Sequence, residues 1–75
     1  MRRKRLHSLV RREAVLHLHD GQTSIRGFLM EFYDDGSVLV AKPVLEAPDE
    51  KDKTALAGEA LIFRDQIKFV QLLGG

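Results

Sequence analysis

The stretch Ile25-Arg26-Gly27-Phe28-Leu29-Met30-Glu31-Phe32-Tyr33, followed by Asp34-Asp35-Gly36, decides the fold. Its apolar residues are too dense for the simple alternation of a strand with one buried face. Gly27 lies inside this run, and a glycine in a strand interior usually marks a bulge or a sharp bend. We therefore predict a strongly bent strand over residues 25–33, as a small closed barrel requires. The Asp-Asp-Gly that follows is typical of a hairpin turn.

The residues before this strand predict a short helix and a first strand. Three apolar residues with i, i+3, i+4 spacing predict a helix over residues 6–13. From Val15 to His19 the apolar period changes to two, which predicts a strand. Asp20-Gly21 is a second hairpin signal, so this strand should pair with the bent one.

The residues after the bent strand predict three more strands. A strand over residues 37–41 should end at Pro43, because proline cannot donate to a strand ladder. Residues 46–56 are mostly polar and charged and predict an exposed loop. Strands over 58–63 and 66–72 follow, with a very tight connection between them. The predicted fold class is mostly β: a short N-terminal helix followed by a five-stranded, strongly bent antiparallel small barrel.

Length and composition limit what this barrel can do alone. The 75 residues predict one domain over 1–75, with a basic arm (1–5), the helix (6–13) and the barrel (14–72). A chain of this size has a marginal core and usually needs disulfides, a metal or neighbouring subunits. There is no cysteine, which excludes a disulfide framework and fits a cytoplasmic protein. No apolar run is long enough for a membrane span, so we expect a soluble protein that assembles.

The net charge of +1 hides two regions of opposite charge. Residues 13–75 carry six basic and eleven acidic residues, a net charge of −5. The first twelve residues carry six basic residues and no acid: Arg2, Arg3, Lys4, Arg5, Arg11 and Arg12. A basic arm of this kind suits a polyanion, because binding to phosphates releases counterions. The alternative is a solvated segment that only aids solubility.

Two segments resemble the motifs of Sm and LSm proteins. Residues 16–21, 27–29 and 32–40 resemble the first motif, and residues 58–70 resemble the second. The centre of the second segment, Phe63-Arg64-Asp65-Gln66-Ile67, is closer to the Tyr-Lys-His-Ala-Ile of bacterial Hfq than to the Ile-Arg-Gly of other members. Residues 6–13 are similar to the end of the Hfq helix.

The resemblance implies a homo-oligomeric ring, with five to seven subunits, that binds RNA. In the family the fourth strand of one subunit pairs with the fifth strand of its neighbour, which would supply the outside support that a small core needs. The rim arginines of Hfq-like RNA chaperones help RNA strands to anneal. The resemblance places this role on Arg11 and Arg12, with Arg2, Arg3, Lys4 and Arg5 upstream.

The pore-side positions depart from the family pattern. The resemblance maps a base-binding pocket onto six residues: Tyr33, Asp35, Ser37, Phe63, Arg64 and Gln66. The stacking residue of the family is here Asp35, which cannot stack, and a ring would repeat Asp34 and Asp35 in every subunit. Such a cluster repels phosphate. Phe63 is expected to pack in the barrel more often than to stack on a base, and Arg64 with Asp65 forms a solvated turn in the alternative interpretation.

Metal and catalytic sites have weaker support. His17 and His19 share one strand face at a spacing compatible with a divalent metal, although exposed strand histidines are commoner. The serines lack a histidine–acid setting, so we expect no enzyme, no cofactor and no small-molecule substrate.

The sequence thus predicts an Sm-like, Hfq-like ring protein that captures and anneals RNA through basic residues. The alternative is a ring-forming structural or scaffolding protein, cellular or viral, that does not bind RNA, since a fold does not fix a function. A third possibility is a small barrel that binds peptides as an adaptor.

Overall fold

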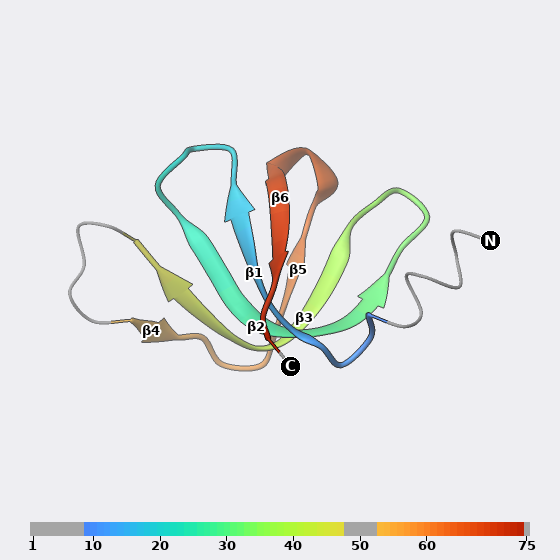
Figure 1. Cartoon of the computed structure of the whole chain (residues 1–75), viewed down its shortest axis with the longest axis horizontal. Helices are drawn as coiled ribbons and strands as arrows, with labels where there is room; N and C mark the ends of the chain where they lie inside the picture. Colours follow the sequence, from blue (N-terminus) through green and yellow to red (C-terminus); the bar gives the residue numbers. More distant parts are fainter. Residues whose placement is uncertain (1–8, 48–52, 75) are drawn as a thin grey trace.

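A computed structural model gives the fold, and it describes residues 9–47 and 53–74. The described chain is an antiparallel sheet that curls on itself. The β1–β2 loop, the β2–β3 loop and the connection between β5 and β6 lie at its upper side in Figure 1. The elements are β1 (Glu13–Leu18), β2 (Ser24–Phe32), β3 (Val38–Glu46), β4 (Thr54–Ala55), β5 (Glu59–Ile62), the 3-10 turn η1 (Arg64–Gln66) and β6 (Ile67–Leu72). Among the described residues, no helix is long and apolar enough to cross a membrane.

The strands are ordered β4-β3-β2-β1-β6, and β5 also pairs with β3. β1 and β2 form the first predicted hairpin, whose turn is fixed by Asp20. Its carboxylate accepts hydrogen bonds from the Gln22 and Thr23 amides, both at 2.8 Å, and from the Thr23 hydroxyl at 2.6 Å. β2 and β3 form the second hairpin, as Asp34-Asp35-Gly36 predicts.

The bend in β2 lies at Gly27, as predicted from the sequence. A Cβ atom at this position would lie 2.4 Å from Val40 Cγ1 and 2.7 Å from the Ala41 carbonyl oxygen. The register between β2 and β3 shifts between Arg26 and Phe28, which marks a bulge opposite the glycine. The absence of a side chain at Gly27 therefore lets β3 cross closely over β2.

The predicted end of the third strand at Pro43 is wrong, because β3 continues to Glu46. The neighbouring Lys42 has φ +51°, and the register pairs Ala41 with Phe28 and Val44 with Arg26. Pro43 thus lies in the bulged part of β3, where a proline is tolerated because the ladder is locally interrupted. It is fully buried, and its carbonyl oxygen accepts a hydrogen bond from the Leu56 amide at 2.9 Å.

The loop predicted over residues 46–56 is wrong at both ends. Glu46 closes β3, and Thr54–Ala55 forms β4, which pairs with Val44 and Leu45. This two-residue strand makes six strands rather than five. Residues 48–52 of the predicted loop lie outside the described residues.

The helix predicted over residues 6–13 is not present in the described part of the chain. Residues 9–11 form a turn and Glu13 already begins β1; residues 6–8 lie outside the described range. Backbone pairing with β2 takes the place of helical bonds. Leu29 exchanges backbone hydrogen bonds with this segment, since its amide donates to the Arg12 carbonyl and its carbonyl accepts from the Arg11 amide.

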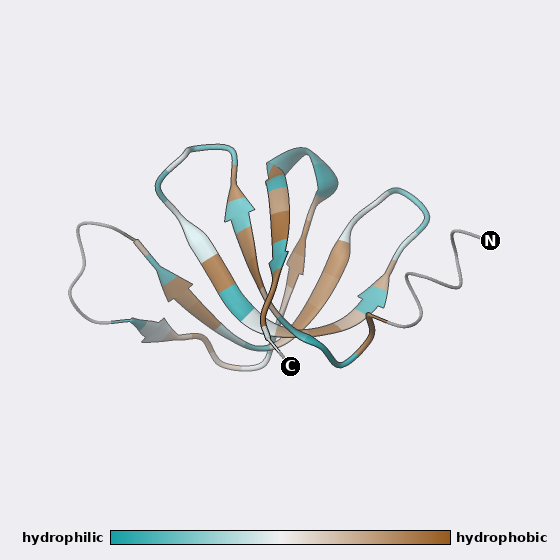
Figure 2. Ribbon diagram, in the orientation of Figure 1, coloured by the Kyte–Doolittle hydropathy of each residue, from teal (hydrophilic) through white to brown (hydrophobic). Residues whose placement is uncertain are grey.

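The core lies inside the curl of the sheet. Its buried apolar residues are Ala14, Leu16, Ile25, Leu29, Val38, Val40 and Ile62. They alternate along β1, β2 and β3 with more exposed positions, so one face of each strand points inward. Figure 2 shows hydrophobic and hydrophilic residues interspersed along the strands, and mainly hydrophilic residues in the hairpin loops.

The curl is not closed between β5 and β6. In the described part of the chain, β6 pairs only with β1, and β5 pairs only with β3. Val70 pairs with the fully buried Leu16, yet its own side chain is 37% exposed. Leu72 pairs with the buried Ala14 and is 40% exposed. The core is therefore uncovered along β6, and both edges offer unpaired backbone groups to another strand.

Candidate nucleic-acid interface

An open cleft lies between the end of β1, the β2–β3 hairpin and η1. Its polar lining residues are His19, Tyr33, Asp35, Ser37, Arg64, Asp65 and Gln66. Phe63 also lines it, together with the apolar residues Phe32, Val38, Ile67 and Val70. The fold thus brings together the six pore-side residues that the sequence resemblance selected from two distant segments.

Three hydrogen bonds within the turn of the β2–β3 hairpin hold Asp35 at the cleft. The Gly36 amide donates to the Tyr33 carbonyl, and the Tyr33 amide donates to the Ser37 carbonyl, both at 2.9 Å. The Ser37 amide donates to Asp35 Oδ1 at 2.8 Å, an arrangement that Asp and Asn favour in turns. Asp35 itself is exposed. Ser37 is only 3% exposed, and its backbone hydrogen bond to Asp35 stabilises the turn.

Asp35 is an anion at neutral pH. The hydrogen bonds from Ser37, the backbone amide first and the side chain second, lower the pKa of the Asp35 carboxyl below its ordinary value of 3.8. The cleft therefore holds a fixed, ionised acceptor where the resemblance places a stacking residue.

Acid should weaken the hairpin through this carboxylate. Because its pKa is lower in the folded chain than in the unfolded one, Asp35 stabilises the fold above pH 3.8, and this contribution is lost as the pH falls below it. We expect Asp35→Asn to show a shallower loss of stability than wild type from neutral pH to about pH 3 in urea unfolding. Asp34→Asn is the control, because Asp34 forms no such side-chain hydrogen bond in the described chain, and equal slopes for the two variants would contradict this role.

Arg64 crosses over the hairpin. A Cβ atom at Gly36 would lie 2.5 Å from Arg64 Cδ and 2.9 Å from its Cγ, and Gly36 has φ +91°. The aliphatic stem of Arg64 therefore packs on the turn that contains Asp35. Within the described ranges, the ion pairs are Glu13–Arg26 and Glu46–Lys53, so Arg64 has no carboxylate within 4.0 Å and does not pair with Asp65.

Two aromatic side chains at the cleft are accessible. Phe63 is 57% exposed, so the expectation that it packs inside the barrel is wrong. It follows the last residue of β5 with extended backbone angles, which turn its side chain away from the core. Tyr33 is 41% exposed, and a hydrogen bond with the Glu31 carboxylate is the main cause that raises the pKa of its hydroxyl.

Arg11 and Arg12 form a second candidate surface, which we call the arginine turn (residues 9–12). Both arginines are exposed. Arg11 has φ +71°, and Arg12 Nη2 donates to the Leu73 carbonyl at 3.4 Å. The other predicted arm residues, Arg2, Arg3, Lys4 and Arg5, lie outside the described residues.

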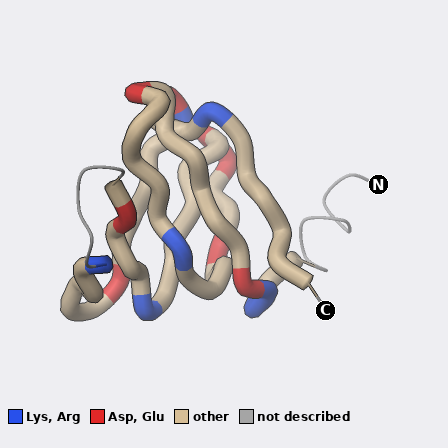
Figure 3. Tube along the Cα trace, turned by 60° about the vertical axis from the view of Figure 1, so that its left-hand side comes forward, with Lys and Arg blue, Asp and Glu red and all other residues tan. Residues whose placement is uncertain are grey.

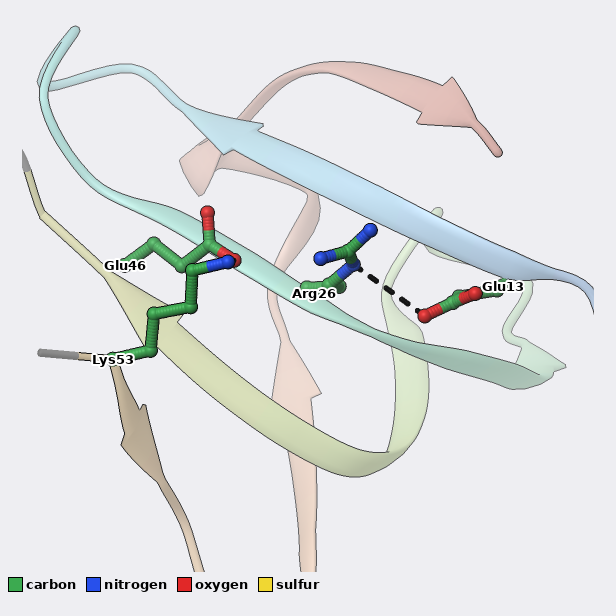
Figure 4. Close-up of polar contacts among 4 residues, drawn as sticks. All are labelled: Glu13, Arg26, Glu46 and Lys53. Atoms are coloured by element: carbon green, nitrogen blue, oxygen red, sulfur yellow. Dashed lines mark ion pairs between the residues drawn. The ribbon is translucent and has the colours of Figure 1, made fainter. Parts of the chain in front are cut away.

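The two surfaces lie on different sides of the barrel. In Figure 1 the segment before β1 lies at the lower edge, whereas η1 and the loops that flank the cleft lie at the upper edge. Basic and acidic positions are interspersed along the described chain (Figure 3). Arg26 is paired with Glu13 on the neighbouring strand, with 3.4 Å between Nε and Oε2 (Figure 4). In the arginine turn, by contrast, Arg11 and Arg12 are adjacent, and neither forms an ion pair with a carboxylate of the described residues.

Among the described residues, His17 and His19 have no third ligand that would complete a metal site. No group of three or more His, Cys, Asp or Glu residues suited to a metal ion occurs in the described ranges. His17 Nε2 is 2.9 Å from Gln71 Oε1, and its ring stacks on Phe69 with centroids 4.4 Å apart. His19 lines the cleft, and its amide donates to the Gln66 carbonyl at 2.9 Å. Nothing in the sequence pattern marks His19 as a cleft residue.

Solved structures share this arrangement of strands. A Pyrococcus abyssi Sm protein in complex with a uridine heptamer aligns with a TM-score of 0.79 and 16% identity, over 97% of this chain and 99% of that one. A heptameric archaeal Sm protein aligns with a TM-score of 0.79 and 15% identity, over 95% and 98% of the two chains. The chain has an Sm-like fold.

The Sm-like fold also occurs outside the archaeal proteins. A chain of the NatC complex bound to CoA aligns with a TM-score of 0.80 and 12% identity, over 91% of this chain and 83% of that one. No family model matches the sequence, and no curated protein matches it. At these identities the likeness establishes the fold alone.

Proposed function

We propose that this Sm-like chain forms a ring that captures RNA through basic residues and helps RNA strands to anneal, in the manner of Hfq. The role is binding, without bond chemistry and without a cofactor, in the cytoplasm. The observation that carries the RNA part is the exposed arginine turn, which lies three residues after a basic arm on an otherwise acidic chain.

The uncovered edges of β5 and β6 support the ring. Exposed Val70 and Leu72 lie on the inner face of the sheet, and a strand of a neighbouring copy would cover them while pairing with the free backbone. The two edges differ in sequence, so each copy offers one edge and accepts the other. Such head-to-tail contacts close into a ring when the rotation between copies closes. We propose five to seven subunits.

A ring would strengthen weak RNA contacts. Arginine pairs with phosphate bidentately and also stacks on bases. Repeating the arginine turn and the arm around a ring converts weak single contacts into avidity for one strand. Two RNA strands held on the same rim would meet at high local concentration, which is how capture favours annealing.

A salt titration tests this proposal. Single-stranded and structured RNAs are expected to bind at about 50 mM salt, with log K falling as log salt rises. Arg12→Ala should reduce the slope by about 0.7 for each phosphate contact that is lost. Arg11→Gly should act similarly, and glycine also suits the φ of +71° at this position.

Arg26→Ala is the matched control. It removes one positive charge from β2, the strand that the arginine turn contacts, but that charge is already paired with Glu13. We expect its slope to stay near that of wild type. The RNA proposal fails when none of the RNAs binds at low salt, or when the three variants reduce the slope equally.

A ring-forming scaffold that does not bind RNA is the second candidate. One observation favours it: Asp34 and Asp35 are adjacent acids in the β2–β3 turn, and Asp35 lines the cleft. The carboxylates would repel phosphate near the pore. Assembly into a ring without detectable RNA binding at about 50 mM salt would favour the scaffold.

A further inference from the structure

The cleft presents a carboxylate from the β2–β3 turn and a guanidinium from η1. Asp35 supplies an exposed, ionised carboxylate, which the Ser37 amide orients by donating to Oδ1 at 2.8 Å. The Arg64 stem lies against Gly36, the next residue, and its guanidinium has no carboxylate partner in the described chain. Exposed Phe63 lies directly before Arg64 and supplies an aromatic face. A flat ligand that stacks on this face would meet both charged groups.

These groups select among nucleobases by their hydrogen-bonding edges. Uracil offers two carbonyl acceptors and a single N–H donor. Guanine offers two adjacent donors, N1–H and the N2 amino group, and two adjacent acceptors, O6 and N7. A carboxylate matches the first pair, and arginine matches the second bidentately. An acceptor-only group such as Asp35 is also repelled by the two carbonyl oxygens of uracil.

We propose that the cleft binds a guanine base, with Asp35 as the residue that sets this preference, Arg64 as the partner of O6 and N7, and Phe63 as the stacking surface. The inference rests on the proposed RNA binding and names the base that the chain selects. The base belongs to an RNA strand or to a free guanine nucleotide, since both carry the same edge. Asp35 makes guanine preferred over uracil.

Labelled pentaribonucleotides that differ only in the central base provide the test. Fluorescence anisotropy with UUGUU, UUUUU, UUAUU and UUCUU should show UUGUU binding about tenfold tighter than UUUUU, the size expected for one bidentate base contact. Inosine in the central position lacks the N2 amino group and should lose part of this preference. Competition by guanosine monophosphate against uridine monophosphate shows whether the free nucleotide suffices or an RNA strand is needed.

Asp35→Asn and Asp34→Asn form the matched pair of variants. Each removes one negative charge from the same turn, and only Asp35 lines the cleft. The amide oxygen of asparagine still accepts the Ser37 amide, so the turn is kept. Asp35→Asn should reduce the ratio of the UUGUU and UUUUU affinities to within about twofold, whereas Asp34→Asn should keep it. Because the ratio is measured, a general gain in affinity from the lost charge cancels.

The outcomes separate this inference from the proposed function. Equal affinity for all four pentamers, with a salt slope that still depends on Arg12, overturns the guanine preference and leaves RNA binding intact. An equal effect of the two asparagine variants on the ratio overturns the role of Asp35. Binding of none of the pentamers or structured RNAs overturns both proposals.

Discussion

Gly27→Ala is expected to lower the free energy of unfolding by about 2–3 kcal/mol, the upper part of the range for an overpacked core. The added Cβ would lie 2.4 Å from Val40 Cγ1 and 2.7 Å from the Ala41 carbonyl oxygen. Val40 is fully buried and the carbonyl belongs to the backbone of β3, so neither can move away freely. Relief of the clash would push β3 off β2 at the bend, where the core residues of both strands meet.

Gly74→Ala is the control for this substitution. A Cβ at Gly74 meets no atom within 4 Å, so we expect a change within about 0.5 kcal/mol, as for most surface substitutions. Urea unfolding followed by circular dichroism, at one fixed protein concentration, measures both values. A change below about 0.5 kcal/mol in Gly27→Ala would show that β2 does not bend closely under β3 at this residue.

Val70→Lys is expected to convert the assembly to monomers. Val70 lies on the inner face of β6 and is 37% exposed in the single chain, so a lysine there can still reach water. Once a neighbouring strand covers this edge, the ammonium would be buried without a partner, at a cost of several kcal/mol per interface. A ring repeats this cost at every contact.

Gln71→Lys is the matched control, because it adds the same charge to the next residue of β6, on the opposite face of the sheet. It should keep the mass of the wild-type assembly. Circular dichroism establishes that both variants are folded, and light scattering then compares their masses. Retention of the full mass by folded Val70→Lys would place the contacts elsewhere than at β6.

Local patterns in the sequence predict most of the fold. A glycine inside a dense apolar run predicts the bend at Gly27, because a residue without a side chain lets a neighbouring strand pass close to the backbone. Hairpin signals at Asp20-Gly21 and Asp34-Asp35-Gly36 place two turns correctly, because their side-chain hydrogen bonds form within three residues. The tight link after residue 63 becomes η1.

Tertiary pairing explains the errors. The backbone of residues 9–12 bonds to Leu29 in β2, which a helical period of three apolar residues does not reveal. Pro43 is tolerated within β3 because a bulge interrupts the ladder opposite Gly27, and that bulge depends on both strands. The pairing of Thr54–Ala55 with Val44 and Leu45 is likewise invisible in a polar segment.

The candidate site is less predictable than the fold. The six residues that the resemblance selected line one cleft, but their chemistry depends on contacts between two distant turns. Neither the packing of Arg64 on Gly36 nor the burial of Ser37 follows from residue spacing. Phe63 illustrates the same limit, since an aromatic residue near a strand end is exposed or buried according to the turn that follows it.

The mass of the wild-type protein in solution tests the proposed ring most directly. Multi-angle light scattering on the eluting peak of a size-exclusion column should give five to seven times the chain mass of 8.5 kDa. The mass should stay constant on dilution through the micromolar range. A single species of 8.5 kDa at all concentrations would contradict the ring, and with it the avidity on which the proposed capture of RNA depends.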